Sequence, residues 1–98
     1  MFASFIEMKL KPGKMAEAVS MTETMQADFQ AMGMKQIIIV DKGNDKAMLL
    51  AFYETAQAQE SVAPKAAEYI GRLGVLLESP PERMQVKVPI NFIFWMLF

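Results

Sequence analysis

The chain has 98 residues, which is room for one domain, and 53% of them are hydrophobic against 21% charged. Ten Lys and Arg balance eleven Asp and Glu without any basic run, so we expect no nucleic-acid partner. Cysteine and histidine are both absent, which excludes disulfides, thiolate nucleophiles, histidine-based triads and the commonest zinc ligands. We expect no metal site and no cofactor.

Neither end of the chain has the pattern of a targeting or membrane-spanning segment. Residues 1–6 are apolar but lack a charged n-region, and Glu7 interrupts them. The apolar run at 90–98 is far shorter than the roughly 20 residues that span a bilayer. We therefore expect a cytoplasmic protein with no membrane span.

Residues 2–11 predict the first strand. Phe2, Ile6, Met8 and Leu10 share one parity, whereas the other parity is largely polar or charged. This alternation indicates a strand with one fully buried face and one partly buried face.

A helix is expected from Lys14 or Met15 to Gly33, after Pro12-Gly13 breaks the strand. Its apolar stripe recurs at spacings of three and four residues. The stripe comprises Met15, Ala18, Thr22, Met25, Phe29 and Met32.

Residues 34–41 and 47–54 predict two strands of a hairpin, joined by a polar turn at 42–46. The middle of each strand is apolar on both parities, at 37–40 and at 48–52. Both faces of the sheet must therefore be covered.

Thr55 is expected to cap a second helix, in which Pro64 either opens a second segment or kinks a continuous one. The stripe of this helix comprises Ala66, Tyr69, Ile70, Leu73, Leu76 and Leu77. Pro80-Pro81 ends it, and residues 84–90 predict a fourth strand, which Pro89 places at an edge.

The predicted order is strand, helix, strand, strand, helix, strand. In this α+β, ferredoxin-like βαββαβ arrangement, two helices lie on one face of a four-stranded antiparallel sheet. The other face is left for a second copy of the chain, and a homodimer, with a higher oligomer as a further option, would cover it.

The chain resembles the dimeric α/β-barrel proteins that include the antibiotic biosynthesis monooxygenase-like domains. The resemblance covers residues 2–90 and rests on the order of the elements and on four short segments. These are Lys11-Pro12-Gly13-Lys14, Met32-Gly33-Met34, Ala51-Phe52-Tyr53-Glu54-Thr55 and Ser79-Pro80-Pro81-Glu82-Arg83.

The resemblance implies an apolar pocket between the sheet and the helices of each subunit. Enzymes of this superfamily include quinone-forming oxygenases without a cofactor, isomerases and haem-degrading oxygenases. The haem degraders need an axial histidine, and other branches use histidine as well, so those activities do not transfer to this chain.

The methionines Met15, Met21, Met25 and Met32 lie on or near one helix face. Methionine is a flexible core filler, and we interpret the stripe as core packing. The alternatives are an adaptable wall for a flat apolar ligand, or a Cu(I) thioether site at Met21 and Met25 that lacks any harder ligand.

Several residues are candidates for ligand binding. Phe5 and Glu7 lie on the less apolar parity of the first strand, and Tyr53 and Glu54 end the third. A carboxylate in an apolar pocket would have a raised pKa and could serve as a base, and a tyrosine could orient a phenol or carbonyl. The structural alternative is a rim carboxylate paired with a lysine, Lys9 or Lys35.

Tyr69 and Arg72 lie one turn apart on the second helix, where Arg72 could accept an acidic group of a ligand. The alternative is an exposed arginine paired with Glu68 or Glu78. Arg83 has the same two interpretations.

The tail 91–98 carries four aromatic residues, among them Trp95, another ligand-binding candidate. We expect a domain at 1–90 and a tail at 91–98 that packs on the domain or on a partner subunit. A pocket lid, a protein-docking peptide and an interfacial membrane anchor are the alternatives.

The sequence contains no complete catalytic constellation. The leading hypothesis is a protein that binds an apolar or aromatic small molecule in the pocket. The alternatives are a cofactor-independent monooxygenase or isomerase using Tyr53, Glu7 and Arg72, and an interaction module that uses the aromatic tail.

Overall fold

A computed structural model describes residues 1–92. The elements follow the order β1 (Phe2–Lys9), α1 (Met15–Thr24), α2 (Gln26–Ala31), β2 (Met34–Gly43), β3 (Lys46–Tyr53), α3 (Ala56–Leu73), the 3₁₀ turn η1 (Gly74–Leu76) and β4 (Arg83–Lys87). The four strands form one sheet in the order β2-β3-β1-β4, and every neighbouring pair is antiparallel. This is the predicted α+β ferredoxin-like fold.

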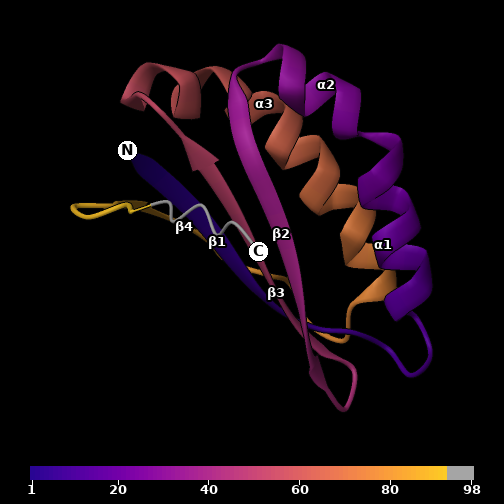
Figure 1. Ribbon diagram of the computed structural model, residues 1–98. Coiled ribbons are helices and arrows are strands. Elements are labelled where there is room, and N and C mark those ends of the chain that lie inside the picture. The colour runs from indigo at the N-terminus through magenta and orange to yellow at the C-terminus, as the bar shows by residue number, and fades with distance from the viewer. Residues whose placement is uncertain (93–98) are drawn as a thin grey trace, which may run out of the picture.

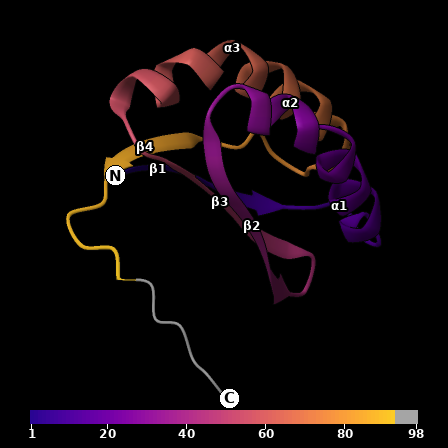
Figure 2. The same ribbon diagram turned by 45° about the horizontal axis from the view of Figure 1, so that its top comes forward.

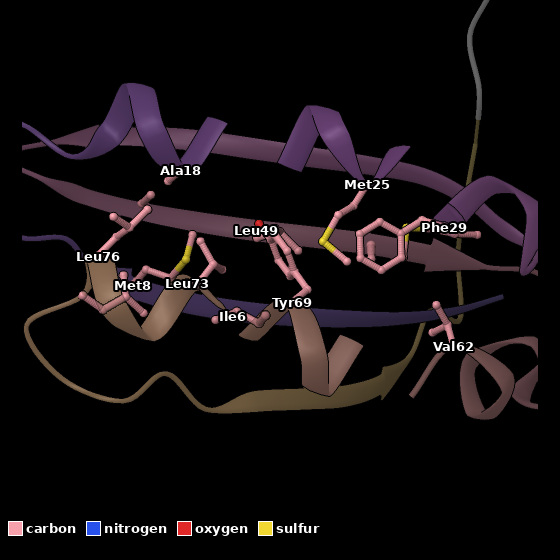
Figure 3. Packing of buried hydrophobic residues seen from close by; sticks show 14 of the residues in the cluster. Ile6, Met8, Ala18, Met25, Phe29, Leu49, Val62, Tyr69, Leu73 and Leu76 are labelled. Atoms are coloured by element: carbon pink, nitrogen blue, oxygen red, sulfur yellow. The ribbon is translucent and has the colours of Figure 1, made fainter. Parts of the chain in front are cut away.

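The helices cover one face of the sheet and leave the other uncovered (Figures 1 and 2). Strand parity explains which residues are buried: in β1, Ile6 and Met8 face the helices, whereas Glu7 faces away. Figure 3 shows the resulting core, in which Tyr69 reaches from α3 toward the sheet and Met25 and Phe29 lie side by side.

The predicted first helix is divided at Met25, which separates α1 from α2. Thr22 donates its hydroxyl hydrogen to the Ala18 carbonyl at 2.8 Å, and the Met25 amide donates to the Thr22 carbonyl at 3.1 Å. Threonine hydroxyls that bond back to the preceding turn bend helices, and this bonding accounts for the break. The apolar stripe is nevertheless continuous, since Ala18, Met25 and Phe29 are all buried.

The hairpin is tighter than the sequence suggested, because β2 extends to Gly43 and only two residues connect it to β3. Asn44 and Asp45 both have positive φ, at 55° and 61°. A two-residue loop with both residues left-handed matches the twist of the strands, and Asn and Asp tolerate that conformation best among residues with side chains.

α3 is one continuous helix, so Pro64 lies inside it and opens no second segment. Pro64 is exposed, and solvent can hydrate the carbonyl that lacks an amide partner there. The helix begins as predicted at Thr55, whose side chain accepts a hydrogen bond from the Ala58 amide at 3.0 Å.

β4 is an edge strand, as Pro89 indicated, but it ends at Lys87, before residue 90. No helix of residues 1–92 is both long and apolar enough to cross a membrane. Trp95 and the other residues of 93–98 lie outside the described residues.

Replacing Thr55 with alanine should lower the free energy of unfolding by about 1 kcal/mol, because the first turn of α3 loses its side-chain cap. Urea denaturation measures this change. Ser61→Ala is the matched control, since its exposed hydroxyl only bonds back to the Gln57 carbonyl within the same helix. Equal destabilisation by the two variants would contradict a specific role for the cap.

Candidate ligand-binding site

A small cavity lies between the sheet and the helices. Its volume is about 20 Å³, enough for one water molecule. It is lined by Ser4, Ile6, Phe29, Met34, Ile37, Leu49, Ala51, Tyr53, Ala66, Tyr69 and Arg83. The lining therefore draws on every strand and on α2 and α3, and most of it is apolar.

Arg83 is the charged residue of this lining. It is the first residue of β4 and lies opposite Ile6, whose side chain belongs to the core, so it has the helix-facing parity. Its Nη2 nitrogen is buried and has no hydrogen-bond partner among residues 1–92. A buried guanidinium donor without an acceptor is costly, and a water, an ion or a ligand that accepts its hydrogen bond would remove that cost.

Tyr69 forms a second polar element of the cavity wall. Only 2% of its surface is exposed, and its hydroxyl lies 2.5 Å from Thr22 Oγ1. Thr22 donates its own hydrogen to the Ala18 carbonyl, so Tyr69 is the donor in this bond. The Phe29 ring meets the Tyr69 ring edge to face, with the centroids 5.7 Å apart, and fixes the phenol between α2 and the sheet.

The pKa of Tyr69 is raised above its ordinary value of 10.0. Burial is the main cause because it disfavours the phenolate, and the hydrogen bond with Thr22 opposes the rise in part. Tyr69 is therefore a neutral phenol at physiological pH, whose oxygen keeps a lone pair as an acceptor.

Ser4 and Tyr53 complete the polar part of the lining. The Gln59 side chain of α3 donates to the Ser4 hydroxyl at 3.2 Å and to the Ala3 carbonyl at 2.9 Å, which ties α3 to β1. Within the described chain, the Tyr53 hydroxyl forms no hydrogen bond, although the residue is 1% exposed. Both groups can accept or donate a hydrogen bond.

A wider cleft adjoins the cavity where α2 leads into β2. Its volume is about 440 Å³, and it is lined by Gln26, Phe29, Gln30, Gly33, Met34, Lys35, Gln36 and Ile37. Phe29, Met34 and Ile37 line both the cleft and the cavity, so these three side chains form the wall between them.

The structure brings together only part of the residues proposed from sequence. Tyr53 and Tyr69 line the cavity. Phe5 and Glu7 have the opposite parity and lie on the uncovered face of the sheet, where the Glu7 carboxylate is 3.7 Å from the Lys42 ammonium. Arg72 is exposed and pairs with Glu68 at 2.9 Å.

The remaining sequence interpretations concern packing and surface pairing. Glu54 lies 3.2 Å from Lys35, as expected for a rim carboxylate. Met25 is buried in the core, and Met15, Met21 and Met32 pack against it, which confirms the core interpretation of the methionine stripe. Among residues 1–92, no three His, Cys, Asp or Glu side chains gather so that they could hold a metal ion.

Sequence reasoning left Arg83 between a ligand-binding role and a surface-paired role, and it did not mention Ser4. The register of β4 against β1 decides the place of Arg83: Met84 and Val86 lie on the uncovered face, which turns Arg83 toward the helices. Ser4 likewise shares its parity with Ile6 and Met8. A polar residue on the buried parity of a strand is the pattern that would have identified Ser4.

Comparisons with known proteins define the fold. No protein-family model matches the chain, and no curated protein is similar to it in sequence. The structure is similar to a protein of unknown function from Nitrosomonas europaea, with a TM-score of 0.77 and 17% identity over 97% of this chain and 95% of that one. It is also similar to the ActVA-Orf6 monooxygenase of Streptomyces coelicolor, solved with the ligand nanaomycin D (TM-score 0.75, 19% identity, 97% and 92% covered).

A third similar structure is a dimeric ferredoxin-like protein from an uncultured marine organism (TM-score 0.74, 10% identity, 96% and 92% covered). The chain thus shares the ferredoxin-like α+β fold of these solved structures, as its sequence indicated. At these identities the likeness concerns the fold alone.

In a Tyr53→Phe background, where Tyr69 is the single tyrosine, tyrosinate absorbance should titrate with a pKa above 10.0. The neutral phenol is favoured in the folded state. The contribution of Tyr69 to the free energy of unfolding is therefore fully present below the tyrosine pKa of the unfolded chain, about 10. It falls as the pH rises toward the pKa of the folded state. Urea unfolding between pH 8 and 11 should show this fall, and Tyr69→Phe should remove it. An ordinary pKa and no fall in stability would contradict the burial of the Tyr69 phenol.

Proposed function

We propose that the protein binds an aromatic or otherwise apolar small molecule that carries an acidic or strongly accepting oxygen. The rings lie in the cavity between the sheet and the helices, and the oxygen accepts from Arg83. The observation that carries this proposal is the buried Nη2 nitrogen of Arg83, which has no acceptor among the described residues. A carboxylate or phenolate satisfies it with a short, charge-assisted hydrogen bond.

The lining of the cavity suits such a molecule. Phe29 and Tyr69 offer aromatic surfaces, and aliphatic side chains supply most of the remainder. Small-molecule sites are typically apolar with a few placed polar groups, which here are Arg83, Tyr53 and Ser4. Because the cavity has room for one water molecule only, a ring enters when part of its wall moves.

The same residues bear on the alternative of a cofactor-independent oxygenase. Arg83 would stabilise the phenolate of an electron-rich substrate, and the similar ActVA-Orf6 protein is a monooxygenase. However, the lining includes no carboxylate that could serve as a base, because Glu7 lies on the other face of the sheet and Glu54 pairs with Lys35. This composition favours binding over catalysis.

Binding of 2-naphthoate and 2-naphthalenemethanol tests the role of Arg83, since the two probes share their rings and differ in charge. By calorimetry, the carboxylate should bind at least about tenfold more tightly, as expected for a hydrogen bond to a charged group. Arg83→Gln should abolish this preference, and the exposed Arg72→Gln should keep it. An unchanged preference in Arg83→Gln would place the anion elsewhere, and no binding of either probe would mean that the cavity holds only water.

We also propose that the protein is a homodimer joined through the uncovered sheet face. One row across this face comprises Ile38, Leu50, Phe5 and Met84, which are paired successively by the strand register. The row is entirely apolar, and within one chain Ile38 is 37% and Met84 50% exposed. A second copy presents the same face, so a twofold axis buries both rows at once, and a dimeric protein of this fold supports the arrangement.

Leu50→Glu should convert the dimer to a monomer, because it places a charge without a partner at the centre of the paired faces. Sedimentation velocity measures the change, which should exceed about a hundredfold in the dissociation constant. Val75→Glu is the matched control, since Val75 is 70% exposed on η1, away from the sheet. A monomeric native protein, or a Leu50→Glu protein that stays dimeric, would refute this interface.

A further inference from the structure

We propose that the cavity and the adjoining cleft are two chambers of one binding site, and that its ligand is an amphiphile with an uncharged polar arm. This inference rests on the proposed function: the acidic ring system occupies the cavity, and the arm, rich in hydroxyl or amide groups, occupies the cleft.

The cavity and the cleft share a wall. Phe29, Met34 and Ile37 line both the cavity and the cleft, so the two spaces share these three residues as a wall. The cavity alone, at about 20 Å³, is too small for a ring system, whereas the cleft, at about 440 Å³, lies within the range of small-molecule sites. A ligand of ordinary size therefore needs both spaces.

The three side chains of the wall differ in how easily they can rotate. Phe29 is held by its edge-to-face contact with Tyr69, and Ile37 is a stiff, β-branched residue paired with Ala51 in the sheet. Met34 is unbranched, follows Gly33 with its φ of +95°, and lies where the β2–β3 register shifts. Met34 is thus the side chain that can rotate aside at the lowest energetic cost and join the chambers.

The polar side chains of the cleft are mainly uncharged carboxamides. Gln26 and Gln30 lie one turn apart on α2, on the same side of the helix, and both line the cleft. Carboxamides donate and accept hydrogen bonds without charge, which matches hydroxyl and amide groups. The lysine of the cleft, Lys35, pairs with Glu54, so its charge is already compensated. The cleft therefore favours a neutral polar arm over a second acid.

The test compares 6-methoxy-2-naphthoate with the 6-O-β-D-glucoside of 6-hydroxy-2-naphthoate. Both carry the anion for Arg83, and only the glucoside carries a polar arm. The glucoside should bind at least about fivefold more tightly, which is the effect of one net hydrogen bond. Gln30→Ala should remove this advantage and leave the affinity for the methyl ether unchanged. Gln57→Ala, which removes an exposed carboxamide from α3, is the matched control and should change neither affinity.

Stopped-flow binding tests the gate in the same system. Met34→Ala should raise the association rate of both probes several-fold, whereas Met21→Ala, which trims another methionine packed on the core but lining neither chamber, should not. Gln30 is exposed, so its variant tests the proposal even if Met34→Ala fails to fold.

The outcomes separate the two proposals. If the methyl ether binds in an Arg83-dependent manner but the glucoside binds no more tightly, the two-chamber site is wrong and the proposed function stands. If neither probe binds, the proposed function fails, and the two-chamber site fails with it.

Discussion

The structure depends on one constraint: a sheet with apolar side chains on both faces meets helices on only one of them. The parity of Ile6 and Met8 in β1, matched by Leu49 and Ala51 in β3, directs one face beneath α1, α2 and α3. This packing closes the core between the sheet and the helices. The opposite parity then leaves an apolar row exposed, and the small size of the domain gives it no second layer of its own. The proposed homodimer would cover this row.

The same packing creates the cavity. β4 is added at the edge of the sheet, beside β1, and its first residue carries an arginine into the space beneath α3. The buried Nη2 nitrogen of Arg83 has no hydrogen-bond partner among the described residues, and the proposed ligand would supply the acceptor. Tyr69 differs, because its hydroxyl is already hydrogen-bonded to Thr22. Its ring, packed against Phe29, can serve as a fixed aromatic wall. The cavity therefore combines a preformed aromatic surface with one nitrogen that lacks an acceptor among the described residues.

Sequence periodicity predicted the four strands, their order and the two helical stripes, because alternation and spacing reflect burial directly. It missed the break at Met25, since that break arises from Thr22 bonding back to its own helix, and it left the role of Pro64 open because solvent exposure decides that role. For the site, residue type identified Tyr53 and Tyr69, which line the cavity. It does not reveal which sheet face the helices cover, so Phe5 and Glu7, which lie on the other face, were grouped with them. Arg83 required the register of β4 against β1, which is a long-range pairing that no local pattern contains.

The central claim is that Arg83 holds an anionic ligand inside the cavity, and a crystal structure of the protein with 2-naphthoate tests it most directly. The account predicts the carboxylate within about 3 Å of the Arg83 guanidinium and the rings against Phe29 and Tyr69, with Met34 displaced. A naphthoate bound elsewhere, with an ordered water in the cavity accepting from Arg83 Nη2, would contradict it.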